Sequence, residues 1–294
     1  MKILLNLTGI LLVLAIMYLI SWKKKNISVK MLVKAVIAQF LIAVILVKVP
    51  AGRYVVSKVS DAVTSVINCG QDGLSFVFGS LADSTAATGS VFAIQVLGNI
   101  VFLSALVSLL YYIGILGFVV KWIGKAVGKL MGTSEVESFV AVANMFLGQT
   151  DSPMPVAMVA LVAAVNKLLG VCGISLQQVF SYVFAPFGFF LGLDPSEILL
   201  EGNLLGSKLV LNEFVAFQQL GGMISSMDYR TGMICAISLC GFANFSSLGI
   251  CVSGIAVLCP EKKSTLARLV FKAMLGGVAV SLISAMTVGL VTLC

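Results

Sequence analysis

The stretch Gly148-Gln149-Thr150-Asp151-Ser152-Pro153 places an acid, an amide, two hydroxyls and a helix breaker within an almost entirely apolar region. An acid at membrane depth costs about 2.5–3.5 kcal/mol on insertion scales, so it is rarely present without a use. Unwound backbone at that depth is tolerated only where it lines a cavity or is buried in protein. The stretch is therefore a candidate binding site at a break in a transmembrane helix.

The composition around this stretch is that of a polytopic, all-α membrane protein. The chain has 294 residues, of which 60% are hydrophobic and 11% charged, and its mean hydropathy is +1.11. These values lie far outside the range of soluble globular domains. They favour a helical bundle whose long apolar segments cross the membrane.

The basic residues gather at the ends of apolar segments, where they set topology. Three groups are Lys23, Lys24, Lys25 and Lys30, then Lys121, Lys125 and Lys129, and finally Lys262, Lys263, Arg268 and Lys272. Loops rich in Lys and Arg usually face the cytoplasm and contact anionic lipids. We therefore expect a multi-pass protein of the cell membrane with both termini outside. The net charge of +7 then needs no nucleic-acid partner.

The chain contains seven Cys without a CxxC spacing and has no His. A zinc site, a Cys-His nucleophile and a Ser-His-Asp triad therefore have nothing to be built from. We expect no cofactor and treat the Cys as packing residues. This composition argues against an enzyme.

Hydropathy predicts four uninterrupted spans, at Leu4–Ile20, Met31–Val49, Val91–Val120 and Leu269–Leu293. Residues 50–90 are mixed in polarity and are expected to lie along the outer surface as amphipathic or loop structure. Lysines at four-residue spacing from Lys121 to Lys129 predict an interfacial helix. Scaffold spans would thus occupy residues 1–120, and the rest, 121–294, would form the transport region of a single functional unit.

Three polar breaks divide the apolar segments of that second region. The first follows the half-span Glu137–Leu147, and the apolar run resumes over Met154–Leu176. The second, Asn212-Glu213-Phe214, lies within Ile198–Leu220, which follows Val179–Leu193 after Asp194-Pro195. The third, Asn244–Gly249, divides the stretch Met233–Leu258. Short apolar pieces with such breaks are typical of the discontinuous helices and re-entrant hairpins of transporters.

If the breaks meet, they present amides, hydroxyls and two acids without Lys or Arg. Such a set suits a neutral, polyhydroxylated solute, because a carboxylate accepts two O–H donors of a vicinal diol. Gln149 and Thr150 would then read the edge of a flat heterocycle. Apolar walls would come from Phe214, Phe217, Phe242 and Phe245.

Four alternatives remain open from the residues. Asp151 could form a hydrated interfacial turn, and Glu213 could be a structural acid paired with Lys208. Asn244 and the following serines could satisfy backbone groups at a kink. Asp151 and Glu213 could also act as the acid pair of an intramembrane hydrolase.

Four parts of the sequence together resemble the concentrative nucleoside transporter family. The stretches Met131–Glu137 and Ala143–Pro153 resemble its first re-entrant hairpin, and Phe102–Leu106 with Leu110–Gly114 its third helix. Lys208–Phe217 is similar to the second hairpin, and Ser238–Ser247 to the broken helix that follows. The motifs keep the family's order over nearly the whole chain.

The resemblance implies a homotrimeric symporter that imports purine or pyrimidine nucleosides with Na+ or H+ by an elevator-like motion. Gln149, Thr150 and Asp151 would contact the nucleobase, and Glu213, Asn244 and Ser247 would hold the ribose. Phe242 would line the pocket, and Asn144 would contribute to the cation (Na+) site.

Two features depart from the family pattern. Asp151 stands where the family usually has Glu. The long segment that normally follows the first hairpin, with two spans and an amphipathic stretch, is missing near residues 156–160. A non-transporting membrane scaffold derived from such a transporter is the alternative that this shortening suggests.

Overall fold

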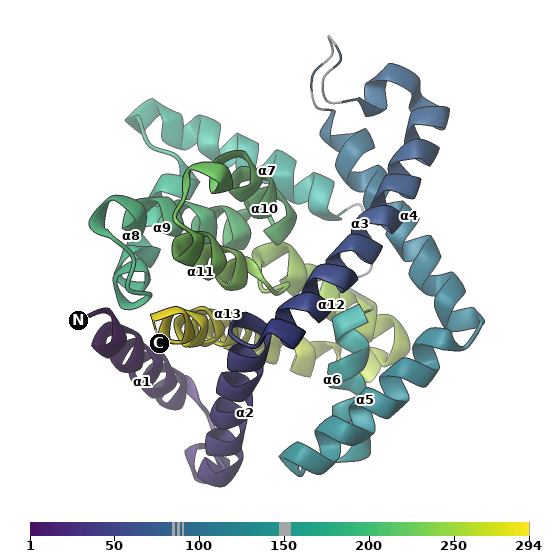
Figure 1. Cartoon of the computed structure of the whole chain (residues 1–294). Helices are drawn as coiled ribbons and strands as arrows, with labels where there is room; N and C mark the ends of the chain where they lie inside the picture. The colour runs from purple at the N-terminus through teal and green to yellow at the C-terminus, as the bar shows by residue number, and fades with distance from the viewer. Residues whose placement is uncertain (84–85, 87–88, 90, 147–153, 294) are drawn as a thin grey trace. The chain divides into compact units, whose positions relative to one another are not determined.

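The computed structural model describes residues 1–83, 86, 89, 91–146 and 154–293, and all regular structure in these ranges is helical (Figure 1). The chain forms two compact units. One contains Met1–Lys48 with Ser152–Cys294, and the other contains Val49–Asp151.

The unit Val49–Asp151 is a series of helices in which each packs against the next: α3 (Pro50–Phe78), α4 (Phe92–Tyr112), α5 (Ile115–Met131) and α6 (Glu135–Phe146). The mixed stretch after residue 50 is thus mainly a 29-residue helix. The continuous span predicted over Val91–Val120 is wrong. Gly114, in the left-handed region at φ 88°, ends α4, and α5 leaves at 79° to it.

Two glycines let α5 and α6 approach closely. A Cβ on Gly124 would lie 3.3 Å from Phe139 Cα, and one on Gly128 would lie 2.8 Å from Ser138 Oγ. The interfacial helix predicted from Lys121 to Lys129 corresponds to α5, which already begins at Ile115. One side of α5 packs against α6. Small residues at such positions are the usual means of close helix contact in membrane proteins.

The larger unit contains the long apolar helices α1 (Lys2–Ile20), α2 (Val29–Val47) and α13 (Lys263–Leu293). Among the described residues, three helices are long and apolar enough to cross a membrane, or up to five segments if each bent pair counts as one span. α13 is the most buried of these helices and packs against α1, α2, α11 and α12. The N-terminus lies near the C-terminal end of α13 (Figure 1).

Among its described residues, this unit also contains shorter α-helices: α7 (Met154–Leu169), α8 (Leu176–Phe190), α9 (Pro195–Val210), α10 (Glu213–Met223), α11 (Tyr229–Leu239) and α12 (Phe245–Leu258). The apolar run predicted over Met154–Leu176 ends early, because Gly173 adopts φ 73° and the chain turns by 86° into α8. A capping box between Ser175 and Gln178 starts α8.

α8 and α9 form a close antiparallel hairpin. A Cβ on Gly202 of α9 would lie 2.4 Å from the Ser181 carbonyl oxygen of α8, and one on Gly206 would lie 3.0 Å from the Gln177 carbonyl oxygen. The contact at Gly202 requires glycine, since real Cβ atoms do not approach so closely, and a Cβ at Gly206 would force its neighbours to shift slightly. The hairpin that the sequence predicted around Asp194-Pro195 is therefore held by backbone proximity.

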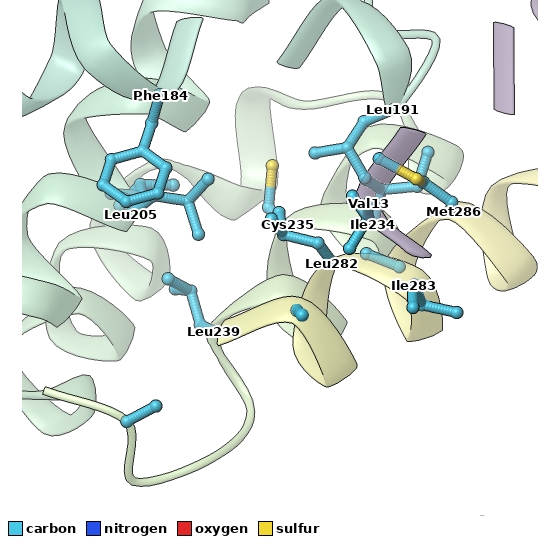
Figure 2. Close-up of a cluster of buried hydrophobic side chains, with 14 of the residues drawn as sticks. Val13, Phe184, Leu191, Leu205, Ile234, Cys235, Leu239, Leu282, Ile283 and Met286 are labelled. Atoms are coloured by element: carbon cyan, nitrogen blue, oxygen red, sulfur yellow. The ribbon is translucent and has the colours of Figure 1, made fainter. Parts of the chain in front are cut away.

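The core of the larger unit joins α1, α8, α9, α11 and α13 (Figure 2). Ile234, Leu239 and Met286 are fully buried there. A polar clamp borders this core: Arg230 donates to the Gly192 and Leu191 carbonyl oxygens at 2.8 and 3.3 Å, and Asn6 donates to the Phe190 carbonyl oxygen at 3.0 Å. The clamp thus satisfies the last carbonyls of α8 and fixes α1 and α11 against it.

Candidate functional site

Two helices of the larger unit begin at an asparagine that follows a break. Asn212 caps α10 by accepting from the Val215 N–H at 2.9 Å, and Asn244 caps α12 by accepting from the Ser247 N–H at 2.8 Å. Both asparagines have extended backbone and are buried. An Asn side chain replaces the missing preceding turn in this way, which explains why each helix starts where it does.

The two helix starts are joined by a hydrogen bond between side chains. Asn244 Nδ2 donates to Glu213 Oε2 at 2.8 Å, across 31 residues of sequence. Glu213 lies in the first turn of α10, where the exposed N–H groups favour a carboxylate. We call this arrangement of Asn212, Glu213, Asn244 and Ser247 the capped junction.

Ser247 and the neighbouring Ser246 hold the capped junction to the backbone of the two breaks. Ser247 Oγ lies 2.8 Å from Asn244 Oδ1 and also donates to the Phe242 carbonyl oxygen. Ser246 Oγ donates to the Leu211 carbonyl oxygen at 3.4 Å and so links the second break to the third. Both serines are buried. The third break itself runs from Cys240 to Asn244, a few residues earlier than the predicted Asn244–Gly249, because Phe245 already begins α12.

A buried lysine anchors this third break from behind. Lys208 of α9 is 2% exposed. Its Nζ donates to the carbonyl oxygens of Ser238 and Cys240 at 2.8 and 3.2 Å, and to Ser281 Oγ at 3.1 Å. All three ammonium protons thus have acceptors, which offsets the cost of burying the charge.

The bonds of Lys208 correct the interpretation of Glu213 as its structural partner. Lys208 holds the end of α11 and the start of the break, whereas Glu213 bonds to Asn244. This anchoring role of Lys208 was not predicted from the sequence. The only signal was a Lys within an apolar segment, which is expensive at membrane depth and therefore rarely without partners.

The aromatic residues around the capped junction divide into two groups. Phe242, Phe214 and Phe217 are 43%, 39% and 38% exposed, so their rings are accessible in the larger unit. Phe245 instead packs into the core, with its ring centroid 6.0 Å from that of Phe180. The first turn of α12 thus directs the ring of Phe245 to α8, and its place in a pocket wall stays a prediction.

The structure brings together Glu213, Phe242, Asn244 and Ser247 of the predicted site residues. Gln149, Thr150 and Asp151 lie outside the described residues. Asn144 falls in helix α6, and its side chain also lies outside the described part of the chain.

Comparisons of the chain with known proteins identify its family. The model of the Na+ dependent nucleoside transporter C-terminus matches residues 152–289, and that of the N-terminus matches residues 8–81. An uncharacterized transporter of Haemophilus influenzae is 29% identical over 408 aligned positions, which cover 99% of this chain and 98% of the relative. The purine nucleoside transport protein NupG of Bacillus subtilis is 25% identical, with 99% of each chain covered.

A solved structure agrees with these sequence matches. A variant of CNTnw in an outward-facing state superposes with a TM-score of 0.88 at 25% sequence identity, and 99% of each chain is covered. The two family models together match most of the chain, which therefore belongs to the Na+ dependent nucleoside transporter family. This family assignment confirms the predicted resemblance and the predicted fold. It identifies the protein as a membrane transporter and argues against the intramembrane hydrolase.

The chain has fewer residues than its relatives in the family. The alignments extend over 397 to 408 positions, whereas this chain has 294 residues. The relatives therefore contain positions without a counterpart here, in agreement with the missing segment predicted from the sequence.

Proposed function

We propose that this chain imports nucleosides across the cell membrane by symport with Na+ or H+, and that the capped junction holds the ribose. The Glu213–Asn244 bond carries this proposal, because it places an acid acceptor and an amide between two helix N-termini. Glu213 Oε1 and the second N–H of Asn244 are chemically suited to the two hydroxyls of a vicinal diol.

The remaining residues have complementary roles in this proposal. Phe242 packs against the nucleoside as a partly exposed apolar wall. Gln149, Thr150 and Asp151 read the base, with Asp151 giving a shorter reach than the usual Glu. Asn144 contributes to cation binding. The site accepts purine or pyrimidine nucleosides, and the protein works as a homotrimer.

The basic loops support the proposed membrane orientation. Lys272 Nζ lies 4.1 Å from the ring centroid of Trp22, and Arg268 Cζ lies 5.6 Å from it. Lys272 also donates to the Ile20 carbonyl oxygen at 3.1 Å. The end of α1 and the start of α13 therefore share one basic, aromatic edge, which is typical of a cytoplasmic interface. Both termini are then outside.

Uptake into proteoliposomes tests the proposal. The purified protein should accumulate labelled uridine or adenosine when an inward Na+ or H+ gradient is imposed, and Glu213→Ala should abolish that accumulation. The control is Glu261→Ala, which removes an exposed acid from the loop before α13. Wild-type protein that binds nucleoside without gradient-driven uptake would support the non-transporting scaffold, which the shortened chain makes the competing function.

A further inference from the structure

Helix α9 carries a fully buried acid that the capped junction does not use. Glu201 is 0% exposed, and neither of its carboxyl oxygens has a hydrogen-bond partner in the described ranges of the chain. An ionised carboxylate in such a place loses its hydration without compensation, which makes it one of the most expensive groups to bury. Glu201 therefore needs a bound cation or a proton.

The polar groups that face Glu201 belong to α9 itself and to α11. α11 presents the Ser238 hydroxyl and the Cys235 thiol, and Lys208 on α9 acts from two turns away. Figure 2 shows Cys235 among the buried hydrophobic side chains, together with Leu205 and Leu239. A sulfur and aliphatic groups are poor ligands for a hard cation such as Na+, so the surroundings favour a proton.

The other helices packed on α9 bring no charge to Glu201. The titratable residue of α8 is Tyr182, which is exposed, and that of α10 is Glu213, which bonds to Asn244. α12 has Cys251, and on α11 Arg230 is bound to the carbonyl end of α8.

Two of the nearby donors, the Ser238 hydroxyl and the Lys208 ammonium, are engaged by other acceptors, and the third, the Cys235 thiol, is a weak donor. Ser238 Oγ donates its proton to the Cys235 carbonyl oxygen at 2.8 Å. Lys208 gives its three protons to Ser238, Cys240 and Ser281. A carboxylate anion would attract at least one of these donors. With the protons of Ser238 and Lys208 directed to other acceptors, only the weakly donating thiol remains for Glu201, which favours a neutral carboxylic acid.

We propose that Glu201 is a proton-binding site and that its proton is the coupling ion of the transport cycle. The second half of this inference rests on the proposed function. The proton joins one carboxylate oxygen from the outside, giving a neutral acid, and leaves to the cytoplasm, restoring the carboxylate. No other bond forms or breaks.

Ser238 and Lys208 provide the link from Glu201 to the nucleoside. When Glu201 loses its proton, the anion draws the Ser238 hydroxyl and the Lys208 ammonium. Lys208 then weakens its bond to Cys240, where the break that carries Asn244 begins. Proton and nucleoside therefore favour the same arrangement, and each raises the affinity for the other.

Infrared spectroscopy of the purified protein at neutral pH tests proton binding independently of transport. Wild-type protein should show the C=O stretch of a buried neutral carboxylic acid, and Glu201→Gln should lack it. Glu197→Gln is the matched control, because Glu197 lies one turn earlier and accepts a hydrogen bond from Thr231 at 2.9 Å. Identical carboxylic-acid bands in wild type and Glu201→Gln would overturn the proposal.

Uptake into proteoliposomes then tests coupling. An inward proton gradient should stimulate uridine uptake by the wild type and by Glu197→Gln. For Glu201→Gln the ratio of uptake with the gradient to uptake without it should fall to about 1, because the amide neither binds nor releases a proton. Unchanged stimulation in Glu201→Gln, or stimulation of the wild type by Na+ alone, would overturn Glu201 as the coupling site and leave nucleoside transport intact. Wild-type protein without uptake under any gradient would refute the proposed function and the coupling with it, whatever the infrared band.

Discussion

Replacing the two capping asparagines one at a time separates the cap from the bond across the capped junction. Asn212→Ala removes only a helix cap, which costs about 1 kcal/mol of stability. Asn244→Ala removes a cap and also the 2.8 Å bond to Glu213. A hydrogen bond to a charged group contributes about 1.5–3 kcal/mol, so Asn244→Ala should be the more destabilising by that amount.

Thermal unfolding of the purified protein in detergent measures the difference. For a chain of this size about 1 kcal/mol shifts the midpoint by about 2 °C, so Asn244→Ala should unfold about 3–6 °C below Asn212→Ala. In a Glu213→Ala background the difference between the two substitutions should shrink by about 1.5–3 kcal/mol, because the bond to Glu213 is already absent. Any difference that remains comes from the contact of Asn244 with Ser247 Oγ. Equal midpoints in the wild-type background would refute the contribution of the Glu213–Asn244 bond.

Two further substitutions test the supports of the capped junction. Lys208→Met removes three hydrogen bonds, although Ser281 Oγ still donates to the Cys240 carbonyl oxygen. The substitution should lower the unfolding free energy by about 2–4 kcal/mol and weaken uridine binding. Lys167→Met on the exposed end of α7 should change stability by less than about 0.5 kcal/mol, and similar midpoints for both variants would contradict the anchoring role of Lys208. Gly202→Ala places a Cβ 2.4 Å from the Ser181 carbonyl oxygen and should cost about 1–3 kcal/mol by separating α8 from α9, while Gly221→Ala, which meets open space, should be neutral or slightly stabilising. An unaltered midpoint in Gly202→Ala would show that the hairpin is not closely packed.

Hydropathy predicted the long helices well but could not predict their bends. Lys2–Ile20 and Val29–Val47 agree closely with the predicted spans, because continuous apolar runs leave the backbone no alternative to a helix. The bend at Gly114 joins two segments that are apolar on both sides. A hydropathy profile therefore does not reveal the bend, which is marked only by the left-handed backbone of Gly114.

The site was predictable as a set of polar breaks, but its connections were not. Asn212, Glu213 and Asn244 stand out in apolar sequence, and the family resemblance assigned three of the four capped-junction residues to one site. Which atoms bond across 31 residues depends on how α10 and α12 pack. Likewise, the acceptors of Lys208 come from α11 and α13.

Glu201 was missed although the same physical rule applies to it as to Asp151. Glu201 is an acid within α9, which packs against several other helices. Because such a group is expensive at membrane depth, its presence indicates a functional role. A flanking Gly and Asn made the local sequence look less apolar than its burial proves to be.

Competition by ribose-modified nucleosides shows whether the capped junction holds the sugar. The measurement is displacement of labelled uridine from the purified protein by uridine, 2′,3′-dideoxyuridine and uracil. Because Glu213 accepts hydroxyl protons, the dideoxy compound should bind about 10–100-fold more weakly than uridine, as loss of a hydrogen bond to a charged group of about 1.5–3 kcal/mol requires. Glu213→Ala should remove that difference. Equal displacement by uridine and the dideoxy compound in the wild type would contradict the account.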